Sequence, residues 1–184
     1  MRELSLHALD IAQNGLAAGA TALRVEVIED TAADTLTLIV ADNGRGMTAQ
    51  QAAQVRDPFY TTRTTRPVGL GIPLLCLAAQ QTGGDVDIDT APGRGTTITA
   101  RFVRSHIDCL PLGDMQATVC TLIQGAPGCH FVYRRAVDGR EFVLDTDELT
   151  ALLGEVPLDT PDVLAWIGEY VCEQTQALTA PPSR

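Results

Sequence analysis

The sequence contains no lysine, so all thirteen of its basic residues are arginines. This absence excludes the phosphate-binding loop with a Gly-Lys step, the strand lysine of eukaryotic-type protein kinases, and every enzyme that forms a Schiff base. Basic residues are also outnumbered, because twenty-three acidic residues give a net charge of −10. We therefore expect no binding to nucleic acid or to an anionic membrane surface.

Long hydrophobic runs are missing as well. The longest nearly uncharged apolar stretch, Val68–Ala79, is interrupted by glycine and proline and is far shorter than the roughly 20 residues of a membrane-spanning helix. The N-terminus lacks the pattern of an export signal. The five cysteines are odd in number and include no C-x-x-C pair, which favours a reducing compartment over a disulfide framework. We expect a cytoplasmic protein.

The composition that is present suits a folded protein, since 45% of the 184 residues are hydrophobic. Acidic charge is concentrated towards the C-terminus, with a net charge of −2 over residues 1–104 and −8 over residues 105–184. We predict one domain over residues 1–104, an acidic α+β extension over residues 105–178, and a disordered tail over residues 179–184.

Hydrophobic periodicity predicts the elements of the first region. A helix is expected over residues 3–18, strands over 23–28 and 36–41, a short helix capped by Thr48, and a helix over 72–82. A hairpin of residues 86–89 and 97–103 follows. This order predicts an α/β fold in which a layer of helices covers a mixed sheet.

The second region is predicted as a helix, a hairpin and two further helices. The helix covers residues 114–124, and the hairpin pairs residues 131–133 with 142–144 around the turn signal Asp138-Gly139. The last helix begins at Thr160-Pro161 and is expected to place an apolar set on one side, namely Val163, Trp166, Ile167 and Tyr170. That side can pack on the first region's sheet or form a homodimer interface, and the sequence leaves both open.

Three polar residues follow one another along the first helix. His7, Asp10 and Asn14 are spaced so that they form one stripe. The Asn14 amide lies one turn from the Asp10 carboxylate, an arrangement that suits Mg²⁺ beside a triphosphate. A solvated polar face is the other interpretation of the stripe.

A glycine-containing loop follows the second strand directly, with the sequence Asp42-Asn43-Gly44-Arg45-Gly46-Met47. Its glycines let the backbone approach a flat ligand, and Asp42 stands at the strand end as an acceptor. A carboxylate there can accept a hydrogen bond from an exocyclic amino group, worth roughly 1.5–3 kcal/mol. That favours adenine over guanine.

Gly69-Leu70-Gly71 leads into a helix, where free backbone N–H groups suit phosphate oxygens. A dinucleotide-binding fingerprint would need another glycine where Leu74 stands, so that interpretation fails. Four arginines near these glycines supply local positive charge: Arg45, Arg56, Arg63 and Arg66. For Arg63 and Arg66, a solvated loop and a phosphate contact are equally open.

Five motifs occur in one order along residues 1–104: Asp10-x-x-x-Asn14, Asp42-x-Gly44-x-Gly46, Asp57-Pro58-Phe59-Tyr60-Thr61-Thr62, Gly69-Leu70-Gly71 and Gly93-Arg94-Gly95-Thr96. The series resembles the ATP-binding domain of the GHKL superfamily, which gyrase, the ninety-kilodalton heat-shock chaperone, sensor histidine kinases and mismatch-repair ATPases share. The resemblance implies the Bergerat fold, a two-layer α/β sandwich with helices on one side of a mixed sheet.

The resemblance also implies site residues, with ATP and Mg²⁺ as cofactors. Asn14 would hold the metal, Asp42 would receive the adenine amino group, and Thr96 would assist Asp42 through water. Gly69 and Gly71 would hinge a lid over the phosphates. The full set of residues expected to bind ATP is Asn14, Asp42, Gly44, Gly46, Met47, Phe59, Thr61, Thr62, Arg63, Gly69, Leu70, Gly71 and Thr96.

The chain departs from this family where its ATPases carry a glutamate as general base, because Asp10 is one methylene shorter. No helix pair with a phosphoacceptor histidine precedes the first helix, so a complete sensor kinase is not expected. The whole chain also resembles short stand-alone ATP-binding proteins that accompany anaerobic redox and hydrogenase systems in bacteria.

Three functions remain open at this point. The first is a protein kinase, similar to histidine kinases or to anti-sigma serine kinases, whose protein partner supplies the phosphoacceptor. The second is a weak ATPase with Asp10 as the base. The third is a binding module that senses ATP and changes its affinity for a partner when ATP binding orders the lid.

Overall fold

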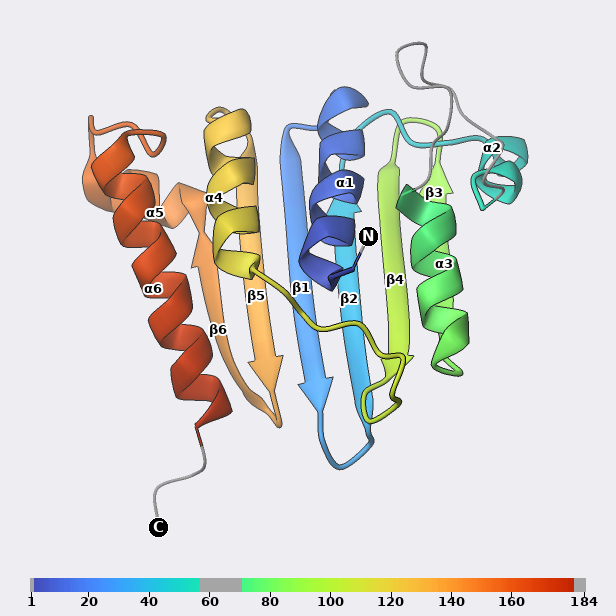
Figure 1. The fold of residues 1–184 in the computed structure, drawn as a ribbon. Helices are drawn as coiled ribbons and strands as arrows, with labels where there is room; N and C mark the ends of the chain where they lie inside the picture. The colour runs from blue at the N-terminus through green and yellow to red at the C-terminus, as the bar shows by residue number, and fades with distance from the viewer. Residues whose placement is uncertain (1, 57–70, 181–184) are drawn as a thin grey trace.

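The computed structural model describes residues 2–56 and 71–180. In these residues a six-stranded sheet carries helices α1, α3, α4 and α6 on the same face (Figure 1). The strands are β1 (Ala22–Asp30), β2 (Thr35–Asp42), β3 (Asp85–Ala91), β4 (Gly95–Val103), β5 (His130–Val137) and β6 (Arg140–Asp145). The helices are α1 (Leu4–Ala17), α2 (Ala49–Gln54), α3 (Gly71–Gln81), α4 (Met115–Gly125), α5 (Thr146–Leu153) and α6 (Pro161–Thr179).

The sheet is mixed and has the strand order β3-β4-β2-β1-β5-β6. Strands β1 and β5 run parallel, with Val25 opposite Tyr133, and the other neighbouring strands are antiparallel. The predicted α/β class, with helices over one side of a mixed sheet, is confirmed. None of the helices in the described ranges is long and apolar enough to cross a membrane.

Buried hydrophobic side chains on the strands form the core between the sheet and the helices. On β1, Leu23, Val25 and Val27 are almost fully buried, whereas Arg24 between them is exposed. Leu4 of α1 and Leu75 of α3 are both 0% exposed against this layer. Burying an aliphatic side chain of this size contributes about 1.5–3 kcal/mol, so the shared layer holds helices and sheet together.

Two local predictions are confirmed at the element ends, the Thr48 cap and the Asp138-Gly139 turn, and the structure adds two further helix caps. Thr48 caps α2 in a capping box with Gln51, and the Asp114 side chain caps α4. Asp138 and Gly139 join β5 to β6 with φ angles of 50° and 79°, as a type I′ turn requires. Asp145 caps α5 by accepting a hydrogen bond from the Asp147 backbone N–H at 2.8 Å.

The C-terminal region continues the first region's sheet through the pairing of β5 with β1. Helix α4 packs beside α1, and α6 packs over α4, β5 and β6. Ile167, Gly168 and Val171 form the buried side of α6. Trp166 was predicted on that side but is 49% exposed, because it projects about 100° away from Ile167 around the helix.

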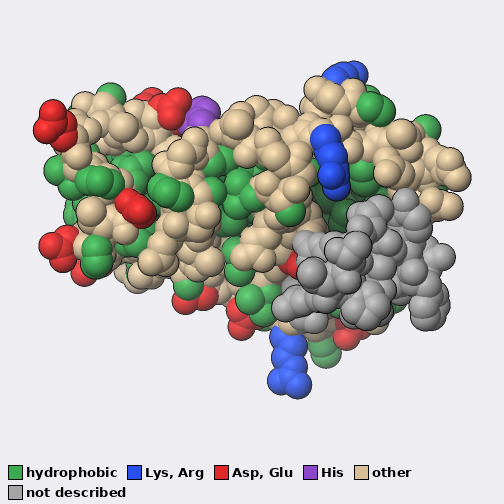
Figure 2. Space-filling model, turned by 90° about the horizontal axis from the view of Figure 1, so that it is seen from above, with side chains coloured by type: hydrophobic (Ala, Val, Ile, Leu, Met, Phe, Trp, Pro, Cys, Tyr) green, Lys and Arg blue, Asp and Glu red, His purple; other side chains and the backbone are tan. Residues whose placement is uncertain are grey.

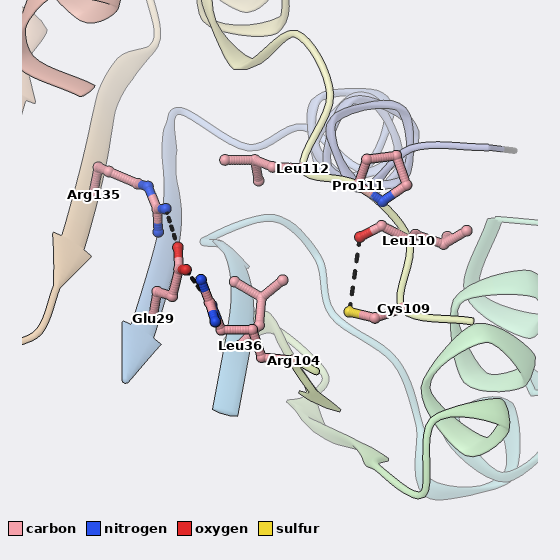
Figure 3. A pocket seen from close by; sticks show the side chains of 8 residues that line it. All are labelled: Glu29, Leu36, Arg104, Cys109, Leu110, Pro111, Leu112 and Arg135. Atoms are coloured by element: carbon pink, nitrogen blue, oxygen red, sulfur yellow. Dashed lines mark hydrogen bonds and ion pairs between the residues drawn. The ribbon is translucent and has the colours of Figure 1, made fainter. Parts of the chain in front are cut away.

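A network of charged side chains lies at the lower end of the sheet. There the sheet is covered by the chain segment that follows β4 and not by a helix. Figure 3 shows Arg135 of β5 and Arg104 on either side of Glu29 of β1, next to a cavity of about 370 Å³. Arg135 is 2% exposed, and its Nη2 lies 2.5 Å from Glu29 Oε2. Burial pushes the pKa of Glu29 upwards, but hydrogen bonds from Arg135 and Arg104 outweigh it and hold that pKa below its ordinary value.

Candidate nucleotide site

The polar stripe of α1 does not face solvent throughout, because His7 is 1% exposed. Asn14 Nδ2 donates to Asp10 Oδ2 at 3.4 Å. A Cβ atom at Gly71 would lie 1.9 Å from Asp10 Oδ2, so the first turn of α3 sits directly against this carboxylate. Burial, and next the N-terminal charge, lower the pKa of His7 against the opposing backbone hydrogen bond at Gly71 and the charge of Asp10. The stripe therefore lies between α1 and α3.

Asp42 ends β2 beneath α1, and its surroundings are made of glycines and backbone amides. A Cβ atom at Gly15 would lie 2.8 Å from Asp42 Cβ, which explains a glycine inside a buried helix face. The Gly44 backbone N–H donates to Asp42 Oδ1 at 2.8 Å. Burial raises the pKa of Asp42, although hydrogen bonds from the backbone of Gly44 and Thr96 act in the opposite direction. No ion pair engages Asp42 in the described ranges.

The loop after Asp42 is tied to its neighbours at both ends. Asn43 Oδ1 accepts hydrogen bonds from the backbone N–H groups of Thr21 at 2.8 Å and Ala22 at 2.9 Å. The Met47 backbone N–H donates to Thr90 Oγ1 at 3.0 Å. Gly46 has a φ of 63°, and a Cβ atom there would lie 2.0 Å from the carbonyl oxygen of Ala91. This loop is therefore a fixed wall beside Asp42.

Thr96 reaches the same place from β4, where it is the register partner of Asp42. Its Oγ1 lies 3.1 Å from Thr90 Oγ1, which also donates to the carbonyl oxygen of Gly95 at 2.9 Å. The tip of the β3–β4 hairpin thus braces both Asp42 and the loop that follows it. A water bridge from Thr96 to a ligand stays a prediction.

The structure brings the described part of the predicted site together along α1. Gly44 and Thr96 lie at Asp42, which in turn lies against Gly15 of α1. The residue before Gly15 is Asn14, which begins the group that includes Asp10 and Gly71. Six predicted residues lie outside the described residues: Phe59, Thr61, Thr62, Arg63, Gly69 and Leu70.

Other residues near the site differ from what the sequence suggested. Arg56 donates to the carbonyl oxygen of Val86 at 2.8 Å, so it secures β3. Gly15 and Thr90 were not predicted as site residues. A glycine in the middle of a helix is costly, by about 1 kcal/mol relative to alanine, and this cost was the available signal for Gly15. Thr90 had no signal, because its role depends on contacts with the loop after β2 and with the start of β4.

A separate group of possible metal ligands forms in the described ranges at the upper ends of β5 and β6. His130, Asp145 and Asp147 place ligand atoms within 4.8 Å of one another, and none of the cysteines joins them. His130 Nε2 lies 2.9 Å from Asp145 Oδ1, and Asp145 caps α5. The hydrogen bond between His130 and Asp145 and the helix cap account for this group.

The part of the site that is described fits the nucleotide that the sequence resemblance implied. Asp42 is half-buried and has no counterion among the described residues, so it offers an acceptor for an amino group, and Gly15 and Gly44 place no side chain against it. Asn14 donates to Asp10 through Nδ2, and its side-chain oxygen is an atom of the kind that a hard cation takes as a ligand.

Comparison with known proteins agrees with this geometry. A family described as "Histidine kinase-, DNA gyrase B-, and HSP90-like ATPase" matches residues 1–106. Sensor protein kinase FleS of Pseudomonas aeruginosa is 35% identical over 109 residues, which cover 59% of this chain and 26% of FleS. Sensor histidine kinase ZraS of Klebsiella oxytoca is 38% identical over 60 residues, which cover 33% of this chain and 13% of ZraS.

The chain therefore spans about a quarter or less of the length of these two curated relatives. Among solved structures, the crystal structure of the N-terminal domain of a DNA repair protein is similar, with a TM-score of 0.51. The similarity covers 79% of this chain and 53% of that chain at 15% identity. At this identity the likeness concerns the fold alone.

Proposed function

Because the chain belongs to the histidine kinase-, DNA gyrase B- and HSP90-like ATPase family, whose domain binds ATP, we propose that it binds Mg-ATP and acts on another protein as a kinase or regulatory partner. The observation that carries this proposal is Asp42, a half-buried carboxylate that forms no ion pair in the described ranges. Burying such a group costs free energy, which a ligand that donates to it can repay.

Asp42 would select the base of the nucleotide. Its Oδ1 already accepts from Gly44, and its Oδ2 lies on the side of Gly15, where a Cβ atom would be 3.1 Å away. An adenine amino group can donate there, whereas guanine presents a carbonyl oxygen to the same carboxylate. Gly44, Gly46 and Met47 would form the wall against which the ring lies.

Asn14 and the start of α3 would hold the metal and the phosphates. The cation would balance phosphate charge when bound, with the Asn14 side-chain oxygen as its protein ligand. The N-terminal turn of α3 at Gly71 offers backbone N–H groups and the positive end of the helix dipole. We propose that the predicted residues between Phe59 and Leu70 complete the phosphate-binding side.

A weak ATPase is the second candidate, favoured by the position of Asp10. Its carboxylate lies within hydrogen-bonding distance of Asn14 and against the first turn of α3, where terminal phosphates would be. Asp10 could therefore accept a proton from an attacking water. In the kinase, Asp10 and Asn14 would orient the metal while a partner supplies the phosphoacceptor.

The resemblance to stand-alone ATP-binding proteins suggests a cytoplasmic partner from a bacterial redox or hydrogenase system.

The fate of the γ-phosphate tests these two candidates. Purified protein is incubated with Mg-ATP labelled at the γ-phosphate, with Asp10→Ala alongside, and both free phosphate and protein-bound label are followed. Phosphate release that Asp10→Ala abolishes supports the ATPase, whereas label retained on protein supports phosphoryl transfer. ATP binding without either product counts against the ATPase and is the result expected of a kinase without its acceptor or of a regulatory binding module.

Asp42→Asn tests whether the protein binds ATP through Asp42, which both the kinase and the ATPase require. We expect the ATP affinity to fall roughly 10- to 100-fold, because a charged hydrogen bond of roughly 1.5–3 kcal/mol is replaced by an amide that is itself a donor. Isothermal titration calorimetry measures the change. Asp87→Asn, at an exposed position on β3, is the matched control and should leave the affinity unchanged. An unchanged affinity in Asp42→Asn would contradict the adenine assignment.

A further inference from the structure

Helix α6 exposes one aromatic and three acidic side chains in a line. Asp162, Trp166, Glu169 and Glu173 follow a spacing of four, three and four residues, which places them on one face of the helix. All four are exposed. This face, called the α6 stripe below, lies opposite the buried side formed by Ile167 and its neighbours.

Trp166 is half exposed, yet it is held in a fixed position. Its ring stacks on Tyr170 with centroids 5.5 Å apart and planes 10° from parallel. Tyr170 meets Phe142 of β6 edge-on at 6.2 Å, and Phe142 meets the buried Tyr133 at 5.7 Å. One face of Trp166 is thus covered by Tyr170, while the exposed part of the ring is presented in a rigid orientation.

Among the residues that the structure describes, no basic side chain pairs with the carboxylates of the stripe. Residues 141–183 contain nine acidic residues and neither arginine nor lysine. None of the ion pairs in the described part of the chain involves Asp162, Glu169 or Glu173. In Figure 2, acidic and hydrophobic side chains are interspersed at the end formed by α5 and α6, and no basic side chain is visible there.

This charge distribution decides which occupant fits. A second copy of the chain would bring the same negative charge to the contact, and nucleic acid or an anionic membrane would be repelled in the same way. A basic protein segment is attracted. The rigid aromatic ring between carboxylates adds a preference for arginine, because a guanidinium stacks on an aromatic face and pairs with carboxylates through its planar N–H groups.

We propose that the α6 stripe is a docking surface for an arginine-containing basic segment of a protein partner. An arginine side chain lies against the exposed part of the Trp166 ring, and Asp162, Glu169 and Glu173 pair with it and with neighbouring basic residues. The inference rests on the proposed function, in which the protein acts on a partner, and it names the surface that holds that partner.

The test uses a fluorescein-labelled helical peptide of arginine, alanine and leucine as the probe, titrated with the full chain in buffer of physiological ionic strength. Fluorescence anisotropy reports binding, and the emission of Trp166, the single tryptophan, reports the place of contact. We expect binding with a change in tryptophan emission. A peptide with citrulline in place of arginine should bind at least roughly tenfold more weakly, since it lacks the charge.

Substitutions in the stripe locate the contact. Glu169→Gln with Glu173→Gln should weaken peptide binding roughly fivefold, from two exposed charge pairs. Trp166→Leu should weaken it by about threefold through the lost cation–π contact. The matched control, Asp87→Asn with Asp89→Asn, removes two exposed charges from β3 at the other edge of the sheet and should change nothing.

Three results would overturn the docking surface. The first is equal weakening by the stripe variant and the β3 control, which would mean that only net charge matters. The second is no binding of the arginine peptide, and the third is equal binding of the citrulline peptide. ATP binding is measured on the same samples, so a failed docking surface with intact ATP binding is distinguished from a failed proposed function.

Discussion

Each end of the sheet holds a partly buried carboxylate, and the two have opposite surroundings. Glu29, at the lower end of β1, meets Arg135 and Arg104, which together hold its pKa below the ordinary value. Asp42, at the upper end of β2, meets glycines and backbone amides, and burial raises its pKa. The comparison shows that two partly buried carboxylates differ in whether a described cation compensates them, and our proposal places the ligand at the one that is not compensated.

The largest effect is expected from breaking the lower network. Arg135→Met leaves Glu29 buried without its main partner, so the free energy of unfolding should fall by about 3–5 kcal/mol. Chemical denaturation measures this change, and ATP affinity should stay the same because the network is remote from Asp42. The double variant Arg135→Met with Glu29→Gln should recover much of the loss. Full stability in the single variant would show that Arg104 alone satisfies Glu29.

A smaller effect is expected from filling the space beside Asp42. Gly15→Ala places a Cβ atom 2.8 Å from Asp42 Cβ, so the carboxylate must shift. We expect ATP affinity to fall roughly tenfold, as overpacking costs about 1–3 kcal/mol. The gain in helix propensity, about 1 kcal/mol, offsets part of the stability loss.

Titration calorimetry with ATP checks the Gly15 prediction. Gly125→Ala, at the end of α4 with no atom within 4 Å of the added Cβ, is the matched control and should bind ATP normally. Normal ATP binding by Gly15→Ala as well would mean that Asp42 has room to move, and the site would then be less rigid than the contacts indicate.

The smallest effect is the opposite pH dependence of the two carboxylates. Because the pKa of Asp42 is raised in the folded state, its contribution to stability falls as pH rises through that pKa. Because the pKa of Glu29 is lowered, its contribution is present above the ordinary carboxyl pKa and is lost as pH falls through the lowered value.

Unfolding curves across the acidic range separate the two groups. The stability of Asp42→Asn relative to the original protein should increase as pH rises, whereas Glu29→Gln should lose its disadvantage as pH falls. If the relative stability of both variants changed in the same direction with pH, the contrast between the two ends of the sheet would be contradicted.

Much of the fold was predictable because it depends on near neighbours in the chain. The Asp138-Gly139 turn, the Thr48 cap and the alternation along β1 and β2 involve residues a few positions apart. The nucleotide motifs were also visible, since strand ends, glycines and helix starts occur in a recognisable order. Burial of His7 and the brace at Thr90 were not, because each depends on segments distant in sequence.

The sequence by itself determined the elements, the α/β class and the family of residues 1–106, because periodicity, caps and glycine positions act locally. Only the tertiary structure decided that β5 pairs with β1, more than a hundred residues away, and that Trp166 faces outwards. It also decided that Glu29 pairs with two arginines, whereas Asp42 has no basic partner among the described residues. Such outcomes depend on which strand edge and which neighbouring side chains the folded chain brings together, and no local pattern encodes them.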